Sequence, residues 1–255
     1  MHPQNPEAWS GLALVCGAGG IGSAMAAELK KQCPSLTVLM AGRGEHRAYD
    51  LHLDLESDQD LERLSEELST RNQPLRLVIN CSGRLHGPNL QPEKRLKQVE
   101  RRQLIEQFSI NSIAPVLLAK AVEPLLHRDQ PFHFASLSAR VGSIGDNRSG
   151  GWYAYRAAKA AQNQLLRCLS IEWARRWPMA TVTLLHPGTT DTRSLQTIPI
   201  VCSNRTTLQP TESRRATHCG AAPTNTRSKR CLFSLGWSVD RLVSMLLELV
   251  EAYHR

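Results

Sequence analysis

The stretch LALVCGAGGIG, residues 12–22, decides the fold. It opens with five apolar residues, as a short strand buried on both faces does, and it continues into glycines. Gly17, Gly19 and Gly22 form the pattern GxGxxG, and residues 21–31 have apolar side chains at helical spacing. A glycine-rich turn between strand and helix lets the backbone approach a pyrophosphate, which the helix N-terminus then faces. We therefore predict a dinucleotide-binding loop, the alternative being a tight turn without a ligand. Its cofactor contacts are Gly17, Gly19, Gly20, Ile21 and Gly22.

Strands and helices alternate outward from this loop. The apolar patterns predict strands over 12–16, 37–41, 51–55, 75–79, 132–137 and 181–185. They predict helices over 21–31, 58–68, from about 99, over 110–126 and over 153–177. Such alternation indicates right-handed βαβ units and a parallel sheet that is covered on both faces. The predicted fold class is α/β: a single Rossmann-fold domain with a doubly wound parallel sheet of six strands. Residues 1–10 form a polar tail, and 11–192 form the dinucleotide-binding and catalytic domain.

The end of the second predicted strand is where folds of this kind read the cofactor's ribose. NAD enzymes place a carboxylate there, which accepts hydrogen bonds from the 2′-hydroxyl. This chain has Ala41, Gly42 and Arg43 instead. A guanidinium can bind a phosphate through two hydrogen bonds, which favours NADP over NAD as the cofactor. In the alternative interpretation Arg43 is a solvated loop residue. Asp54, at the end of the third predicted strand, is expected to meet the adenine.

Tyr155 and Lys159 are four residues apart, so they share one face of the last long predicted helix. A phenol has a free pKa of about 10, and lowering it to near 7 requires about 4 kcal/mol of preference for the phenolate. A neighbouring ammonium and an oxidised nicotinamide both supply that preference. Tyr155 could then protonate a carbonyl oxygen as hydride reaches the carbon. The alternative is a pair of helix-surface residues without a catalytic role.

These motifs together make the chain resemble the short-chain dehydrogenase/reductase family, and within it the C-factor and sniffer-type carbonyl reductases. The resemblance covers roughly residues 11–192. It rests on residues 17–22, NCSG at 80–83, Asn111, GSI at 142–144, GGWYAYR at 150–156, Lys159, HPG at 186–188 and Thr192.

The resemblance implies a role for each matching residue. Tyr155 would be the general acid and base, and Lys159 would also hold the nicotinamide ribose. Asn111 would help to seat Lys159 and a proton-relay water. The remaining cofactor contacts would be Asn80, Ser82 and Gly83 beside the sheet, and Pro187, Gly188, Thr189 and Thr192 along the nicotinamide. The implied substrate is a small carbonyl or alcohol compound, and a homo-oligomer is compatible with the family.

The chain departs from the family pattern at three places. The glycine loop is one residue shorter than the commonest form, and Asn80 is followed by Cys-Ser-Gly where Asn-Ala-Gly is usual. The third departure concerns the catalytic serine. Alignment on GSI at 142–144 places Ala139 where the hydroxyl belongs. A shift of one residue would bring in Ser138, which we predict to be the catalytic serine, with Ser136 and Ser143 as alternatives.

The resemblance breaks after Thr192. Residues 193–231 carry seven Lys and Arg against one Glu, with no periodicity, so we expect an atypical basic loop, ordered or disordered. Either this is a long lid, or it is divergent or translated from a shifted reading frame. Residues 232–255 are expected to add a C-terminal helix on the same domain, without the usual seventh strand. Because most of the net charge of +8 lies in 193–231, a specific nucleic-acid partner is disfavoured.

Cysteine usage and the N-terminus bear on the compartment. The seven cysteines include no CxxC pair, and His218-Cys219 alone is no metal site, so no metal is expected. Residues 1–10 lack the apolar core of a signal peptide, and no apolar run has the length of a membrane span. We therefore expect a cytoplasmic protein without a membrane partner.

Two functions remain open on the sequence alone. The first is an NADP-dependent oxidoreductase that transfers hydride between nicotinamide and a carbonyl or alcohol, with Tyr155 as acid and base. The second is a catalytically impaired dinucleotide-binding protein, either a sensor or a divergent or frameshifted copy, and the abnormal segment after Thr192 favours it.

Overall fold

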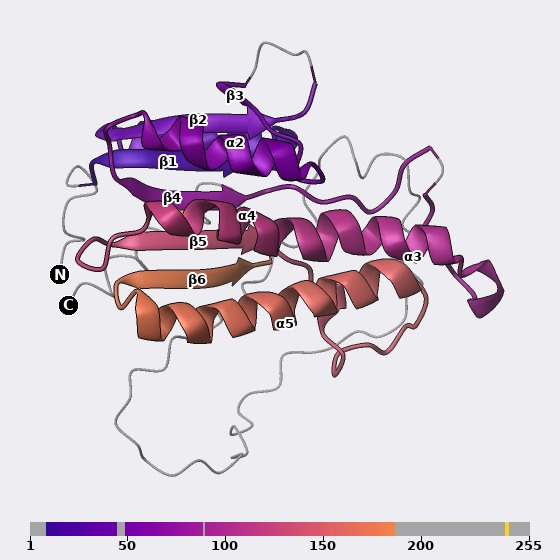
Figure 1. Ribbon diagram of the computed structural model, residues 1–255. Helices are drawn as coiled ribbons and strands as arrows, with labels where there is room; N and C mark the ends of the chain where they lie inside the picture. The colour runs from indigo at the N-terminus through magenta and orange to yellow at the C-terminus, as the bar shows by residue number, and fades with distance from the viewer. Residues whose placement is uncertain (1–8, 45–48, 89, 187–242, 245–255) are drawn as a thin grey trace, which may run out of the picture.

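A six-stranded sheet forms the centre of the molecule. The computed structural model describes residues 9–44, 49–88, 90–186 and 243–244 (Figure 1). Its strands are β1 Gly11–Cys16, β2 Leu36–Gly42, β3 Leu51–His52, β4 Leu75–Asn80, β5 Phe132–Leu137 and β6 Ala180–Leu185. All neighbours pair in parallel, in the order β3-β2-β1-β4-β5-β6. The predicted single Rossmann-like domain with six parallel strands is confirmed.

Five α-helices connect these strands. They are α1 Gly20–Gln32, α2 Asp58–Ser69, α3 Arg101–Phe108, α4 Ala114–Val122 and α5 Tyr153–Arg176. In Figure 1, α2, α4 and α5 lie in front of the sheet. Short 3-10 turns occupy Leu96–Gln98, Glu123–Leu125 and Arg140–Gly142, and one π-helical turn occupies Ser109–Ile113.

Two predicted elements differ from the structure. The strand predicted over 51–55 pairs with β2 only at Leu51–His52. Just after it, the Leu53 amide still donates to the carbonyl oxygen of Gly42 at 3.0 Å, and the Asp54 amide donates to Asp60 of α2 at 2.8 Å. A helix predicted from about 99 and another over 110–126 are one continuous helical path, in which the π turn joins α3 to α4. Periodicity cannot predict a π turn, since it changes the hydrogen-bond step and leaves the helical direction almost unchanged.

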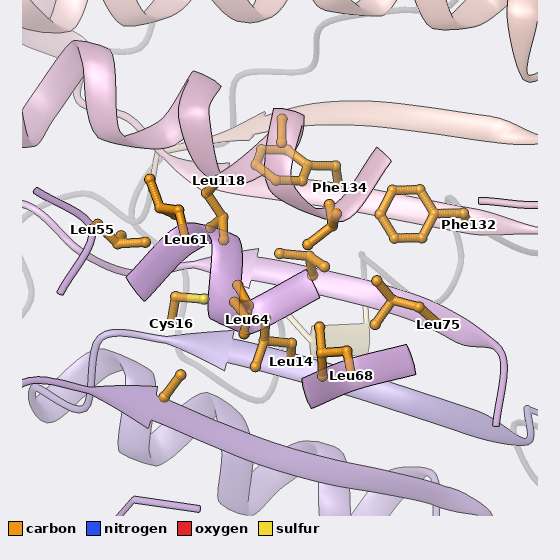
Figure 2. Packing of buried hydrophobic residues seen from close by; sticks show 14 of the residues in the cluster. Leu14, Cys16, Leu55, Leu61, Leu64, Leu68, Leu75, Leu118, Phe132 and Phe134 are labelled. Carbon is orange, nitrogen blue, oxygen red and sulfur yellow. The ribbon is translucent and has the colours of Figure 1, made fainter. Parts of the chain in front are cut away.

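The core has one layer on each face of the sheet. Figure 2 shows the layer under α2 and α4, where Leu14 and Phe134 from the strands lie near Leu61, Leu64 and Leu118 from the helices. The opposite layer joins alternate strand residues to the inner side of α1, through Val15, Met25 and Leu29. Because both faces of β1 are covered, its sequence is continuously apolar.

The C-terminal segment contributes two described residues. Val243 is fully buried in the layer on the α1 side, and the Ser244 hydroxyl donates to Gln32 Oε1 of α1 at 3.4 Å. Most of the predicted tail 1–10, the loop 193–231 and the rest of 232–255 lie outside the described residues. None of the described helices combines the length and the apolar character that a membrane crossing requires.

Candidate active site at the carboxyl ends of the strands

A cavity of about 370 Å³ opens at the carboxyl ends of β1, β2 and β4. We call it the glycine-loop cavity; it is lined by residues 16–19, 41–43, 53–55 and 81–84, with Tyr49 and Ile110. Strand order reverses here, because β1 lies between β2 and β4. Ligands of open α/β sheets bind at such a switch point.

The glycines of the loop fit close packing of backbone against backbone. Gly17 has φ +95°, and a Cβ added there would lie 2.8 Å from the amide nitrogen of Ser82. A Cβ added at Gly22 would overlap the carbonyl oxygen of Gly17. Gly19 is different, because a Cβ there would meet no heavy atom within 4 Å. No side chain caps α1, which begins at Gly20 and Ile21, so its first turn fits a pyrophosphate.

Two carboxylates lie beside Arg43, which lines this cavity. One guanidinium nitrogen of Arg43 lies 3.4 Å from Glu56 and 3.8 Å from Asp54. Glu56 also lies 3.6 Å from Arg84, whose other nitrogen lies 2.8 Å from Glu106. The sequence interpretation found no acid beside Arg43 and did not identify Glu56 or Arg84. The contact between Arg43 and Glu56 depends on the short β3 and the turn after it, which no motif indicates.

Tyr155 and Lys159 lie in the first two turns of α5. The Lys159 ammonium is 5.9 Å from the centroid of the Tyr155 ring, so the pair does come together. Lys159 is only 3% exposed, and its Nζ donates to the carbonyl oxygen of Leu137 and to Gln162 Oε1, both at 2.9 Å. Trp152 packs edge-on against Tyr155, with ring centroids 6.4 Å apart.

Burial dominates the electrostatics of this pair. It raises the pKa of Tyr155 to about 12 and lowers the pKa of Lys159 to about 7. Burial penalises both charged forms, and the Lys159 ammonium donates to Leu137 and Gln162. The expectation that an ammonium and an oxidised nicotinamide together lower the phenol pKa concerns the site with its dinucleotide, and it stays a prediction.

Three serines were candidates for the catalytic hydroxyl. Ser138 follows β5 directly, is buried, and donates to Asn163 Oδ1 at 2.6 Å. Asn163 lies one helical turn after Lys159, so Ser138 is adjacent to the helix that carries the pair. The Ser136 hydroxyl instead accepts from Gln162 Nε2 inside the core, and Ser143 accepts from a backbone amide of its own loop.

Asn111 and Gly83 connect the two parts of the site. Asn111 is buried in the π turn, where Nδ2 donates to the carbonyl oxygen of Arg84 at 2.8 Å and Oδ1 accepts from the amide of Arg84 at 3.1 Å. A Cβ added at Gly83 would lie 3.0 Å from Asn111 Oδ1 and 3.7 Å from Lys159 Nζ. Gly83 lines the glycine-loop cavity, so Asn111 and Lys159 lie beside one of its lining residues. Asn80 and Ser82 precede Gly83, and Asn80 Oδ1 accepts from the Ser82 amide at 3.1 Å.

Glu93 is a buried acid that sequence reasoning missed. Its carboxylate oxygens lie 3.3 and 3.4 Å from the amide of Ala154 in the first turn of α5. Its carbonyl oxygen accepts from the amide of Trp152 at 2.5 Å. Gly150, Gly151 and Trp152 all have positive φ, at 62°, 65° and 52°, so the chain enters α5 through a left-handed turn held by Glu93. A single acid in a polar loop gives no sequence signal for such a contact.

The remaining predicted contacts, Pro187, Gly188, Thr189 and Thr192, lie outside the described residues. Among the described part of the chain there is no group of three side chains arranged to hold a metal ion.

Comparison with known proteins gives one family and several partial relatives. The family model described as short chain dehydrogenase matches residues 12–200. A 1-hydroxy-2-glutathionyl-2-methyl-3-butene dehydrogenase of Rhodococcus sp. is 31% identical over 136 residues, covering 53% of this chain and 56% of the relative. The C-signal protein of Myxococcus xanthus is 37% identical over 93 residues, covering 36% and 55%. The chain thus spans about half the length of these two relatives.

Solved structures share the fold over most of the described region. A putative short-chain dehydrogenase/reductase from Burkholderia multivorans with bound NADP is 25% identical, with a TM-score of 0.61 and coverage of 72% of this chain and 82% of that one. The carbonyl reductase Sniffer of D. melanogaster is 24% identical, with a TM-score of 0.62 and coverage of 72% and 83%. The second likeness concerns the fold alone.

Proposed function

This chain belongs to the short-chain dehydrogenase family, and on that premise we propose that it transfers hydride between NADP and a small carbonyl or alcohol compound. One observation carries the proposal: Gly83 lines the glycine-loop cavity and lies so near Lys159 that a Cβ added at Gly83 would be 3.7 Å from the Lys159 ammonium. A dinucleotide whose phosphates occupied the glycine loop would therefore extend toward the helix that carries Tyr155 and Lys159.

Three side chains, Tyr155, Ser138 and Lys159, have separate roles in the proposed reaction. A dinucleotide held by the glycine loop at Gly17, Gly19 and Gly22 would provide the hydride chemistry. The Tyr155 phenol is protonated at neutral pH and would donate to the carbonyl oxygen as hydride reaches the carbon. Burial raises its pKa to about 12, so this donation depends on stabilisation of the phenolate by neighbouring positive charge. Ser138 would orient that oxygen, and Lys159 would stabilise the phenolate that remains.

Arg43 supports NADP over NAD in this proposal. A 2′-phosphate would meet the Arg43 guanidinium, which is half-exposed at the cavity. That phosphate must compete with Glu56 and Asp54, which already neutralise part of the Arg43 charge. We therefore expect Arg43→Ala to remove the preference, measured as the ratio of NADPH to NADH dissociation constants by fluorescence titration. An unchanged ratio in Arg43→Ala would contradict this role.

Two tyrosines of α5 provide a matched test of the reaction. Tyr155→Phe should lower turnover of a panel of small carbonyl compounds by at least about 100-fold, the effect of losing a general acid, with NADPH affinity unchanged. Tyr153→Phe removes the hydroxyl of an exposed residue on the same helix and should leave turnover within twofold. Equal turnover in the two variants would rule out Tyr155 as the acid.

The position of Lys159 favours a second candidate function. Its ammonium donates to Leu137 and Gln162. A protein that binds a dinucleotide as a sensor, without turnover, could keep this arrangement. NADPH binding together with no Tyr155-dependent turnover on any carbonyl compound of the panel would support this candidate.

A further inference from the structure

Gln162 is a buried polar residue that the proposed reaction does not use. It lies on α5 three residues after Lys159 and is fully shielded from solvent. Its Oε1 accepts from Lys159 Nζ at 2.9 Å, and its Nε2 donates to the Ser136 hydroxyl at 2.8 Å and to the carbonyl oxygen of Leu137 at 3.2 Å. An amide placed inside a core costs free energy unless its polar atoms are paired. Both polar atoms of the Gln162 amide have partners here, so the buried side chain is held in one place.

The orientation of the Gln162 amide follows from its partners. An ammonium can only donate, so the amide oxygen must face Lys159. A carbonyl oxygen can only accept, so the amide nitrogen must face Leu137. Gln162 and the Leu137 carbonyl are therefore both acceptors for the same buried cation, and the amide of Gln162 also joins them to each other.

The contacts continue from Gln162 to the glycine-loop cavity. The Ser136 hydroxyl of β5 also accepts from Asn80 Nδ2 of β4 at 3.0 Å. Asn80 Oδ1 in turn accepts from the amide of Ser82 at 3.1 Å and from its hydroxyl. Ser82 lines the cavity. These residues form the polar chain: Ser82, Asn80, Ser136, Gln162 and Lys159.

Gln162 is one of the groups that surround the positive charge of Lys159. From β5 the ammonium meets the Leu137 carbonyl, from the loop after β4 it meets Gly83, and from α5 it meets Gln162 and the titratable ring of Tyr155. Among the described residues no carboxylate forms an ion pair with it. Neutral acceptors therefore stabilise the charged form, and burial opposes it.

We propose that Gln162 is a positioning residue for Lys159: it holds the ammonium at the end of β5 and couples its place, through Ser136 and Asn80, to Ser82 in the glycine-loop cavity. The role given to Lys159 rests on the proposed function, but the contact with Gln162 does not. Loss of the Gln162 acceptor lowers the proton affinity of Lys159. A negative charge at the same place raises it.

The test measures the ionisation of Lys159 itself. In protein with isotope-labelled lysine side chains, NMR follows each ammonium across pH, and Lys159→Arg identifies the signal of Lys159. Gln162→Leu keeps the volume and removes the acceptor, so the pKa of Lys159 should fall by about one unit or more. Gln162→Glu should raise it by a similar amount. Gln164→Leu makes the same exchange at an exposed position on α5 and should change nothing.

A second readout is the dinucleotide. The pH at which NADPH affinity changes should move in the same direction as the pKa of Lys159 in each variant. A role confined to packing would change the melting temperature of Gln162→Leu and Gln162→Glu without shifting this pKa in opposite directions. A Lys159 pKa that stays within 0.3 units in both variants would overturn the proposal, and so would shifts of the same sign. Because the pKa is measured without substrate, an inactive protein would sink the proposed function and leave this inference standing.

Discussion

The two halves of the sheet bury different kinds of side chain. In β1, β2 and β3 every buried side chain among the described residues is apolar or absent. In β4, β5 and β6 the buried set includes five polar residues, Asn80, His133, Ser136, Thr181 and Thr183. The first half offers a ligand its backbone and its glycines. The second half positions side chains through buried hydrogen bonds, so its chemistry depends on partners brought from several elements.

The largest effect we expect is from a side chain at Gly22, in the half built from backbone. A Cβ there overlaps the carbonyl oxygen of Gly17, and backbone cannot yield as a flexible side chain can. Gly22→Ala should lower the free energy of unfolding by about 3 kcal/mol and reduce NADPH affinity by more than about 100-fold. Calorimetry and fluorescence titration measure the two effects.

Gly19→Ala is the matched control in the same loop. A Cβ at Gly19 meets no heavy atom within 4 Å, so the melting temperature should not change. Any loss of NADPH affinity in Gly19→Ala would then report contact with the ligand itself. If Gly22→Ala binds NADPH normally, the close backbone packing of the first half is not needed for binding.

The next effect concerns pH and belongs to the second half. Burial lowers the pKa of His133 from 6.5 to about 4, and its Nδ1 contacts the Thr181 hydroxyl. Between pH 6.5 and 4 the unfolded chain therefore binds a proton that the folded chain does not. The native state keeps its full stability above pH 6.5 and loses about 3 kcal/mol as pH falls to 4.

Denaturant titrations across this pH range test the contribution of His133. His133→Phe removes the imidazole, and Thr181 keeps the carbonyl oxygen of Phe132 as an acceptor at 3.4 Å. The variant should therefore lose most of the pH dependence between 6.5 and 4. His127→Gln removes an exposed imidazole and should keep it. The assignment to His133 is wrong if the two variants show the same slope.

A smaller effect, confined to turnover, is expected at Ser138. Its hydroxyl is fixed by Asn163 beside the helix that carries Tyr155. Ser138→Ala should lower kcat by about 100-fold, the lower end of the effect of losing one hydrogen-bond donor to a developing charge, with NADPH affinity unchanged. Ser143→Ala should stay within threefold. The opposite ranking of these two variants in steady-state kinetics would assign the catalytic role to Ser143.

The same contrast explains what could be predicted from the sequence. Continuous apolar strands and alternation with helices are local patterns, so the six parallel strands and the glycine loop were predictable from residues 12–22 outward. Tyr155 and Lys159 were predictable because helical spacing fixes their common face. The shortening of β3 was not, because the point at which its pairing with β2 ends depends on the tertiary structure.

The partners of the site residues could not be predicted in the same way. Gln162 follows Lys159 by three residues, but only the packing of α5 on β5 brings it to Ser136. Glu56 and Arg84 are 28 positions apart, and their side chains lie 3.6 Å from each other. No local pattern encodes such pairs, since each depends on the completed tertiary structure. For the same reason the directions of the Tyr155 and Lys159 pKa shifts required the structure.

The smallest effect tests how the second half orients its principal helix. Glu93 accepts from the amides of Trp152 and Ala154, through its carbonyl and its carboxylate, at the start of α5. Loss of a helix-capping side chain costs about 1 kcal/mol, so Glu93→Ala should lower the melting temperature by a few degrees. Because Tyr155 lies one residue after Ala154, turnover should fall in the same variant.

Two further variants separate the capping role of Glu93 from its charge, one at residue 93 and one control at another helix. Glu93→Gln keeps an acceptor for the Ala154 amide and should retain most of the stability and turnover. Glu100→Ala removes an exposed acid at the N-terminus of α3 that makes no capping bond, so it should change neither. If the Glu93→Ala variant has the same melting temperature and turnover as the Glu100→Ala variant, the left-handed turn from Gly150 to Trp152 holds α5 by itself. The second half would then depend less on buried side chains than its contacts indicate.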